Sequence, residues 1–218
     1  MEDEIILVDK PEGISSFGVV AKVRGFLKRK FGHKIKVGHT GTLDPFATGL
    51  LILLSGKMTK KSGEFLKLDK VYEATIKLGF VSTTGDPEGE IEKRSEKRPE
   101  MGEVETVLRQ FVGNIQQTVP RFSAVKINGR RAYQLARKGE DFETPTREVE
   151  IYSIEILNYD FPELTIRCHV SSGTYIRTLG EDIGEALNTG AYLTALRRTR
   201  VGKYDVMDAK RLEDFLEV

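Results

Sequence analysis

The segment at positions 38–49, Gly-His-Thr-Gly-Thr-Leu-Asp-Pro-Phe-Ala-Thr-Gly, restricts the fold more than any other part of the sequence. Its three glycines and one proline exclude a regular helix and a central strand, because both residue types interrupt regular backbone. Four hydroxyl or imidazole side chains surround Asp44, the single acid of the segment. Its carboxylate could serve as a nucleophile or base. A tight turn at Asp44-Pro45 explains the same residues, and composition alone favours that turn.

Basic and acidic residues are segregated along the chain, although the formal net charge is only +1. Positions 10–63 hold 11 Lys or Arg and two acids, and positions 121–147 hold seven bases and three acids. Positions 85–108 hold eight acids and four bases. Any one basic cluster is explained by a solvated helix face, but several together favour binding of a polyanion such as nucleic acid.

Several classes of protein are disfavoured by the residue counts. The chain has one cysteine, Cys168, and three histidines, which leave no disulfide framework and no Cys-clustered zinc site. The longest apolar run, Leu50–Leu54, is far shorter than the roughly 18 residues of a membrane span. The start of the chain lacks the pattern of a signal peptide. We therefore expect a cytoplasmic protein without metal, cofactor or membrane contact.

Apolar periodicity predicts mixed helices and strands without strict βαβ alternation, which is typical of the α+β class. Residues 49–54 fit either a strand or a helix, and residues 83–89 fit a loop. Strands are expected at 5–8, 71–78, 147–157 and 163–170. Helices are expected from Ser15 or Ser16 to Leu27, at 100–112, 131–137 and 174–187, and around Leu212, Phe215 and Leu216.

Two further residues have both a structural and a functional interpretation. Arg177 falls in the first turn of an expected helix, where the helix dipole disfavours a cation unless it pairs with an anion. Simple solvent exposure explains it equally well. Tyr72 shares a strand face with Ala74 and Ile76, which is typical of a core tyrosine, whereas stacking on a nucleobase would require a flat ligand.

Five motifs together resemble those of the TruB-type tRNA pseudouridine synthases and occur in the order of that family. The segment at 38–51 closely resembles the family signature. The others are the DKPxGxSS element at 9–16, the KxY element at 70–72, the P-x-aromatic-S-A-hydrophobic-K element at 120–126 and the GTYIR element at 173–177. The resemblance implies a pseudouridine synthase core, in which helices flank a mixed, mostly antiparallel sheet with a central RNA-binding cleft. It implies one catalytic domain over 1–218, and the C-terminal PUA-type domain common in bacterial members is not evident.

The resemblance also implies a reaction. The T-loop uridine of tRNA (position 55 in standard tRNA numbering) would be flipped out, cut from its sugar and rejoined through C5, with no cofactor or metal. Asp44 would be the catalytic carboxylate, and whether it attacks C1′, attacks the ring or acts as a base stays open. Arg177 would pair with Asp44, and Tyr72 would stack on the uracil and take the C5 proton.

The remaining site residues follow from the same resemblance. His39 would contact RNA around the extruded base, and Leu196 would pack against the uracil. Lys10 would support the catalytic loop. Lys10, Gly41 and Thr42 would also be among the residues that bind the substrate. The expected partner is the T arm of tRNA, bound by a monomer without an obligate protein partner. Two alternatives stay open, namely a non-catalytic RNA-folding factor and a guide-RNA-dependent synthase of another uridine.

Overall fold

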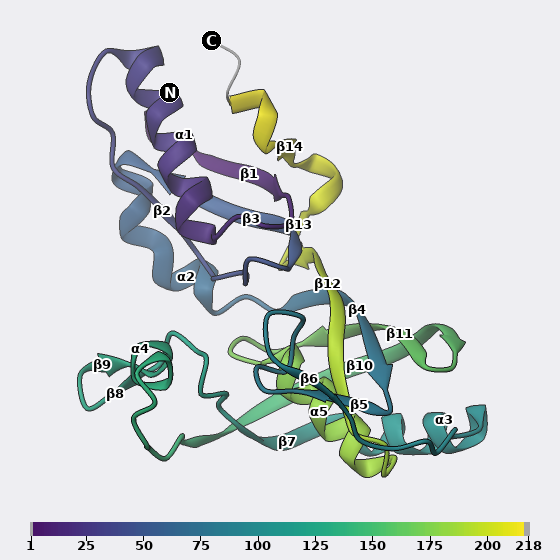
Figure 1. Ribbon diagram of the computed structural model, residues 1–218. Helices are drawn as coiled ribbons and strands as arrows, with labels where there is room; N and C mark the ends of the chain where they lie inside the picture. Colours follow the sequence, from purple (N-terminus) through teal and green to yellow (C-terminus); the bar gives the residue numbers. More distant parts are fainter. Residues whose placement is uncertain (1, 216–218) are drawn as a thin grey trace. The chain divides into compact units, whose positions relative to one another are not determined.

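The computed structural model of the chain describes residues 2–215, and these fall into two compact units. The first unit comprises Met1–Glu73 and Ala195–Val218, and the second comprises Ala74–Thr194. Strand β4 (Lys70–Leu78) begins in the first unit and ends in the second, and β12 (Ala191–Val201) does the reverse (Figure 1). The first unit is therefore assembled from both ends of the chain.

The first unit contains one long helix and a small sheet. Its hydrogen-bonded strand order is β14-β1-β3-β12, with β2 paired to β3 and β13 paired to β12. The pairing of β1 with β3 is antiparallel, and that of β3 with β12 is parallel. Besides its parts of β4 and β12, the unit contains β1 (Ile5–Lys10), α1 (Ser16–Phe31), β2 (Val37–His39), β3 (Thr48–Ser55), η1 (Gly56–Lys61), α2 (Ser62–Leu66), β13 (Tyr204–Asp205), η2 (Val206–Asp208), β14 (Lys210–Arg211) and η3 (Leu212–Phe215).

Helix α1 begins and ends at residues suited to those positions. The Ser15 side chain accepts a hydrogen bond from the Gly18 backbone N–H at 3.1 Å, as an N-cap does. Gly32 ends the helix in the left-handed conformation with φ 77°. Between them, valines and a leucine spaced three and four residues apart point into the core: Val19, Val20, Val23 and Leu27. The helix predicted from Ser15 or Ser16 is confirmed, and it continues to Phe31.

Residues 49–54, for which the sequence allowed either a strand or a helix, belong to strand β3. This strand is buried on both faces. On one face, Leu51 and Leu53 pack with α1 and with Ile6 and Val8 of β1. On the other face, a second cluster forms from Leu50, Ile52, Leu54, Phe65, Val201 and Val206. The apolar run is therefore a central strand, and its lack of alternation reflects burial on two sides.

The C-terminal helix predicted around residues 212–216 is a 3-10 helix and not an α-helix. Leu212–Phe215 forms a short 3-10 helix, η3, whose Leu212 and Phe215 side chains are buried against α1 and β1. Phe215 meets Phe26 edge-to-face at 5.6 Å between ring centroids. The predicted Leu216 lies outside the described residues.

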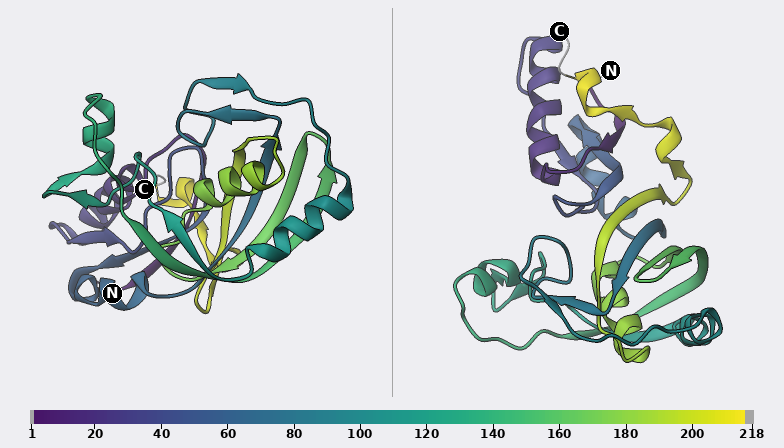
Figure 2. Two further views of the ribbon diagram at one scale, coloured as in Figure 1. Left: turned by 90° about the horizontal axis from the view of Figure 1, so that it is seen from below. Right: turned by 45° about the vertical axis from the view of Figure 1, so that its right-hand side comes forward.

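The second unit is a curved antiparallel sheet with two helices on one side (Figure 2). Its strand order is β12-β4-β11-β10-β7, and β10 pairs antiparallel with both β11 and β7. Helices α3 and α5 lie together on one side of these strands (Figure 2). Besides its parts of β4 and β12, the unit contains β5 (Phe80–Ser82), β6 (Ile91–Lys93), α3 (Met101–Gln110), β7 (Gly113–Thr118), β8 (Lys126–Ile127), β9 (Arg130–Arg131), α4 (Ala132–Arg137), β10 (Thr146–Asp160), β11 (Glu163–Val170) and α5 (Ile176–Ala186).

The pairings confirm the predicted α+β class with a mixed, mostly antiparallel sheet. Parallel pairs are found between β1 and β14 and between β3 and β12, whereas the pairs β1–β3, β2–β3, β10–β11, β10–β7, β12–β13, β5–β6 and β8–β9 are antiparallel. The expectation of one catalytic domain over 1–218 stays a prediction. Over residues 2–215, no helix has the length and apolar character that a membrane crossing requires.

Candidate active site

The glycine-rich segment is a loop between β2 and β3, and Ser16 holds its centre. The Ser16 Oγ accepts a hydrogen bond from the Leu43 N–H at 2.8 Å and donates one to the Leu43 carbonyl at 2.8 Å. Both residues are buried. One side chain at the start of α1 therefore satisfies both backbone groups of the residue before Asp44, which fixes the loop against the helix.

Pro45, the residue after Asp44, is held by Lys10 of β1 and by Gly13, which follows that strand. The Pro45 carbonyl accepts hydrogen bonds from the Gly13 N–H at 2.8 Å and from the Lys10 ammonium at 3.1 Å. Lys10 is fully buried, and its Nζ also donates to the carbonyls of Pro11 and Ile14 at 2.8 and 2.7 Å. Lys10 thus supports the loop, and its place among the substrate-binding residues stays a prediction.

Asp44 lies between these two anchored neighbours, and its side chain is half-buried. The Ala47 N–H donates to the Asp44 carbonyl at 3.1 Å, so the tight turn predicted from Asp44-Pro45 is present. Leu43 and Phe46 point into the core on either side of the turn. The turn and a chemical role are compatible, because a rigid turn holds a carboxylate in one place.

Arg198 of β12 holds the same loop through hydrogen bonds. Sequence analysis did not identify it as a site residue. Its guanidinium is 3% exposed and donates to the Leu50 carbonyl at 2.8 Å and to the Gly41 carbonyl at 3.1 Å. Gly49 makes this approach possible, because a Cβ there would lie 2.3 Å from the Arg198 carbonyl oxygen and its φ is +101°. No local sequence signal marked it, because its hydrogen-bond acceptors lie in other segments of the chain.

His39 ends β2 beside the loop, where its surroundings favour the neutral imidazole. Burial first, and the Arg198 charge second, lower the pKa of the His39 imidazole. The Gly41 N–H points at the His39 Nδ1 at 3.4 Å, so Nδ1 accepts and Nε2 carries the proton. Thr42, on the same loop, is exposed, and Gly41 is half-buried.

Tyr72 and Leu196 belong to the first unit and are both buried, at 8% and 7% exposure. Tyr72 shares the buried face of β4 with Ala74 and Ile76, as predicted. Lys70 starts that strand, and its Nζ donates to the carbonyls of Leu66 and Leu68 at the end of α2. Burial, followed by the Arg198 charge, lowers the pKa of the Lys70 ammonium to about 8.

Arg177 belongs to the second unit, in the first turn of α5 as predicted. Gln117 of β7 fixes the start of that helix, since its fully buried amide accepts from the Tyr175 N–H at 2.7 Å and donates to the Tyr175 carbonyl at 3.0 Å. The Arg177 guanidinium donates to the carbonyls of Thr84 and Phe122 at 2.9 and 2.8 Å. It is buried, which rules out the solvent-exposed interpretation.

Asp86 forms an ion pair with Arg177, and sequence analysis missed it. The two groups lie 3.2 Å apart, with side chains 4% and 6% exposed. The Thr84 hydroxyl and the Glu88 N–H also donate to the Asp86 carboxylate, at 2.6 and 3.0 Å. The sequence did carry a signal, because Asp86 precedes a proline within a Gly- and Thr-rich loop, just as Asp44 does.

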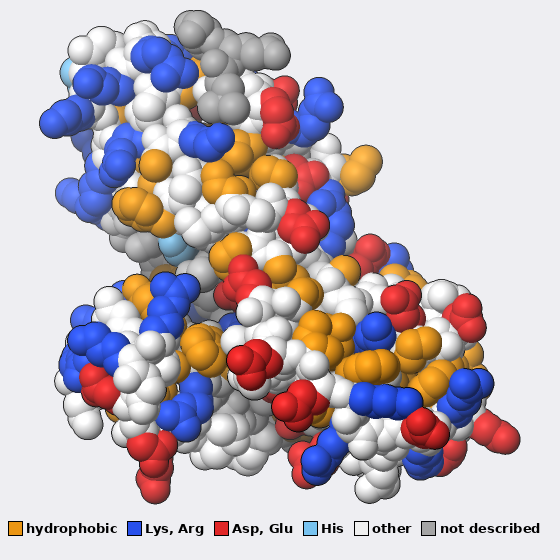
Figure 3. Space-filling view, viewed as in Figure 1, with side chains coloured by type: hydrophobic (Ala, Val, Ile, Leu, Met, Phe, Trp, Pro, Cys, Tyr) orange, Lys and Arg blue, Asp and Glu red, His pale blue; other side chains and the backbone are white. Residues whose placement is uncertain are grey.

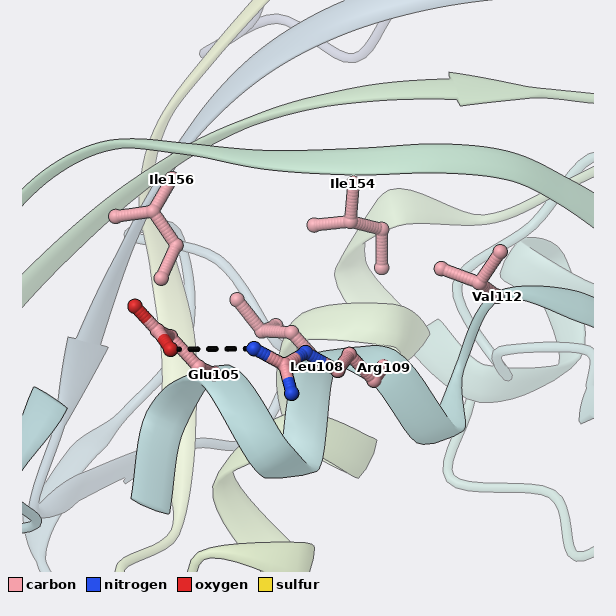
Figure 4. A pocket seen from close by; sticks show the side chains of 6 residues that line it. All are labelled: Glu105, Leu108, Arg109, Val112, Ile154 and Ile156. Atoms are coloured by element: carbon pink, nitrogen blue, oxygen red, sulfur yellow. Dashed lines mark hydrogen bonds and ion pairs between the residues drawn. The ribbon is translucent and has the colours of Figure 1, made fainter. Parts of the chain in front are cut away.

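A separate hollow in the second unit contains none of the predicted site residues (Figure 4). It has a volume of about 230 Å³ between α3 and β10. Its wall is largely aliphatic, and the Glu105–Arg109 ion pair at 3.3 Å lies at one side: Glu105, Leu108, Arg109, Val112, Ile154 and Ile156. Within residues 2–215, no group of three or more His, Cys, Asp or Glu side chains is arranged to hold a metal ion.

Comparison with known proteins places two family models end to end on this chain. Residues 28–176 match the TruB family pseudouridylate synthase (N terminal domain), and residues 177–218 match the tRNA pseudouridylate synthase B C-terminal domain. The chain is 49% identical over 218 residues to the tRNA pseudouridine synthase B of Phocaeicola vulgatus, covering 99% of this chain and 93% of that protein. It is 44% identical to the tRNA pseudouridine synthase B of Burkholderia lata, covering 97% of this chain and 64% of that protein.

Two solved structures share the fold. A chain in a crystal structure of a Cbf5-Nop10-Gar1 complex matches with a TM-score of 0.74 and 30% identity, over 98% of this chain and 53% of that one. A chain in a structure of an H/ACA RNP bound to a substrate RNA containing 2'-deoxyuridine matches with a TM-score of 0.70 and 28% identity, over 98% and 52%. This chain spans about half the length of those two proteins.

Proposed function

Since the chain belongs to the TruB family of pseudouridine synthases, we propose that it isomerises the T-loop uridine of tRNA (position 55 in standard tRNA numbering) to pseudouridine. The observation that carries the proposal is the anchored Asp44 turn, in which Ser16 holds the preceding residue and Lys10 the following one. An RNA-binding protein without chemistry would not need one carboxylate fixed in this way.

The reaction is an isomerisation, so its atoms balance without a co-reactant. The C1′–N1 bond of the uridine breaks, the uracil turns, and a C1′–C5 bond forms. The proton on C5 is lost and a proton is gained at N1. Asp44 acts as the carboxylate that drives glycosidic cleavage, by attack on C1′, by attack on the ring or by removal of a proton.

The other site residues divide the remaining work. Arg177 pairs with Asp44 and fixes its charge, while Asp86 and two backbone carbonyls keep the guanidinium in place. Tyr72 stacks on the uracil and takes the C5 proton, and Leu196 packs against the base. A neutral His39 contacts RNA beside the flipped nucleotide, with Gly41 and Thr42 alongside. The base enters the RNA-binding cleft that the family resemblance implies, and residues 1–218 supply the catalytic domain.

The enzyme acts on the T arm as a monomer without guide RNA, in the cytoplasm where tRNA is processed. The relatives named tRNA pseudouridine synthase B support this version, because their identity to the chain is well above that of the H/ACA proteins. A synthase that depends on a guide would be inactive in an assay from which guide RNA and partner proteins are omitted.

The decisive experiment measures tritium release from a tRNA transcript labelled at uridine C5, with wild type and Asp44→Asn run side by side. We expect release by wild type alone, mapped to the T-loop uridine, with RNA affinity of the variant within a few-fold. Absence of release by wild type from tRNA and from a T-arm hairpin would contradict the proposal. Joint loss of turnover and binding in Asp44→Asn would assign Asp44 a folding role instead.

A further inference from the structure

Helix α1 carries an exposed basic surface that the proposed chemistry does not use. Lys22, Arg24, Lys28 and Arg29, here called the α1 basic face, are all exposed. Across residues 2–215, none of the four forms an ion pair with an acid, and no acidic residue occurs between Glu12 and Asp44. Figure 3 shows the Lys and Arg side chains gathered over the α1 part of the first unit.

These cations form two rows along the helix. Arg24 and Lys28 are one turn apart, and Lys22 and Arg29 are two turns apart on the neighbouring side. Phe17 continues the first row and is 65% exposed, with the Arg24 guanidinium 6.0 Å above its ring centroid. An exposed aromatic ring beside arginine is a common contact for a nucleotide base or sugar.

The strip between the two rows is lined by small residues, Gly18, Ala21 and Gly25. Gly18 is constrained by packing, because a Cβ there would lie 2.8 Å from the Ile14 side chain. Gly25 is not, since a Cβ would meet only the Arg29 guanidinium at 3.8 Å. A glycine in a helix interior is less favourable than alanine. An open Gly25 between two rows of cations therefore gives a phosphodiester backbone room to approach the helix closely.

The α1 basic face has a fixed position relative to Asp44 within the first unit. Ser16, the first residue of α1, holds the catalytic loop through Leu43. At about 1.5 Å per residue, positions 22–29 lie roughly 9 to 20 Å along the helix axis from that anchor. When the uridine of an RNA has reached Asp44, parts of that RNA at distances of this order from the uridine can therefore contact α1.

We propose that the α1 basic face binds the phosphate backbone of the substrate RNA outside the loop that contains the reacting uridine. The inference rests on the proposed function, since it takes a tRNA as the ligand. An anionic membrane fits the helix less well, because the apolar residues of α1 are buried in the core and only Phe17 is available to insert. The cations on either side of the strip would neutralise phosphates of the RNA stem.

The test compares tRNA binding by Lys22→Gln/Arg29→Gln and Arg24→Gln/Lys28→Gln with a control, Lys67→Gln/Lys210→Gln. The control removes two exposed lysines of the same unit that lie off the helix. Each lost phosphate contact lowers the slope of log K against log salt by about 0.7 to 0.9. We expect each α1 variant to lose about 1.5 of slope and about tenfold in affinity near 0.1 M salt, with the control unchanged.

Two readouts separate this inference from the proposed function and from misfolding. The kcat for tritium release at saturating tRNA should stay within about twofold of wild type, while KM rises with Kd. Gly25→Gln should raise or leave unchanged the thermal midpoint, because it improves helix propensity, yet weaken RNA binding several-fold. A destabilised fold would lower both the thermal midpoint and the affinity for RNA.

Each contrary result has a defined meaning. Equal slopes for the α1 variants and the control overturn the inference, whether or not wild type releases tritium. Absence of release by wild type, with the slope loss present, contradicts the proposed reaction and leaves the RNA surface standing. The α1 variants could lose binding to phosphatidylserine–phosphatidylcholine vesicles while their tRNA binding is unchanged. That result would assign the surface to membranes and overturn the inference.

Discussion

At the scale of single residues, two adjacent serines of the DKPxGxSS element have separate tasks. Ser15 caps α1 by accepting from the Gly18 N–H at 3.1 Å. Ser16 is buried and makes two hydrogen bonds to Leu43, both 2.8 Å long. The same hydroxyl chemistry thus begins the helix at one position and anchors the loop that contains Asp44 at the next.

Ser16→Ala should therefore reduce turnover more than Ser15→Ala. Removing Ser16 leaves the Leu43 N–H and carbonyl buried without partners, which lowers the free energy of unfolding by about 1 to 3 kcal/mol. A displaced Asp44 should lower kcat by up to about 100-fold, because small misplacements of a reacting group are costly.

Ser15→Ala is the matched control for this prediction. Loss of the cap lowers the free energy of unfolding by about 1 kcal/mol and leaves kcat near that of wild type. The measurements are urea unfolding and single-turnover tritium release. Equal loss of kcat in the two variants would mean that the loop is positioned by something other than Ser16.

Asp86 offers a second residue-scale test, because its ion pair with Arg177 is almost completely buried. Asp86→Ala removes the Asp86 carboxylate from a buried guanidinium, and we expect the free energy of unfolding to fall by about 3 to 5 kcal/mol. Glu155→Ala, which removes the exposed partner of Arg167 at 3.1 Å, should cost at most about 1 kcal/mol. Similar urea midpoints for the two variants would rule out a dominant role for the buried pair.

At the scale of elements, α5 combines a cation in its first turn with two acids in its second. Burial is the main reason that the pKa of Glu181 is raised from 4.5 to about 7, against the opposing Arg177 charge. Burial likewise raises the pKa of Asp182 from 3.8 to about 6. Asp86 and Asp182 add to the shift of Glu181, so α5 carries two acids that keep their protons to a higher pH in the folded state than free carboxylic acids do.

The stability of the protein should consequently decline between about pH 4.5 and pH 7. In this window the folded state keeps the Glu181 proton while the unfolded chain releases it, so folding binds a proton and stability falls as the pH rises. Glu181→Gln should flatten the dependence of the urea midpoint on pH over that range. A wild-type midpoint that rises steadily from pH 4.5 to 7 would contradict the raised pKa of Glu181.

Most elements with strong apolar periodicity were predicted correctly, and the misses have a physical cause. Helices α1, α3, α4 and α5 and strands β1, β4, β10 and β11 occur near their predicted positions. Strand β7 was not predicted because Gly-Asn-Ile-Gln-Gln-Thr is polar, and its buried Gln117 holds the start of α5 through hydrogen bonds that no local pattern reveals. Strand β12 was missed because its arginines bind acceptors on other strands, which no local pattern encodes.

At the scale of the whole molecule, the predicted site residues come from distant parts of the chain. Asp44, Tyr72 and Leu196 belong to the first unit, and Arg177 and Asp86 belong to the second. The excess of cations is concentrated at 10–63 and 121–147, whereas acids dominate 85–108. A net charge near zero is therefore compatible with strong attraction of RNA to particular surfaces.

Affinity for tRNA should fall steeply with ionic strength as a result. If several phosphates are contacted, log K should decrease linearly with log salt, by about 0.7 to 0.9 per contact. Asp44→Asn should follow the same line, because Asp44 is not a phosphate ligand. Filter binding between low and moderate salt measures the slope, and a flat response would refute binding through the basic segments.

Local periodicity and residue order were sufficient to predict the α+β class, the family and the short motifs that contain Asp44, Tyr72 and Arg177. The central position of β3 and the contacts of Ser16, Arg198 and Asp86 with the predicted site residues and their loops could be seen only in the folded chain. These contacts join positions as far apart as Gly41 and Arg198. A buried donor takes whichever acceptor the fold brings near, and that choice leaves no periodic trace in the sequence.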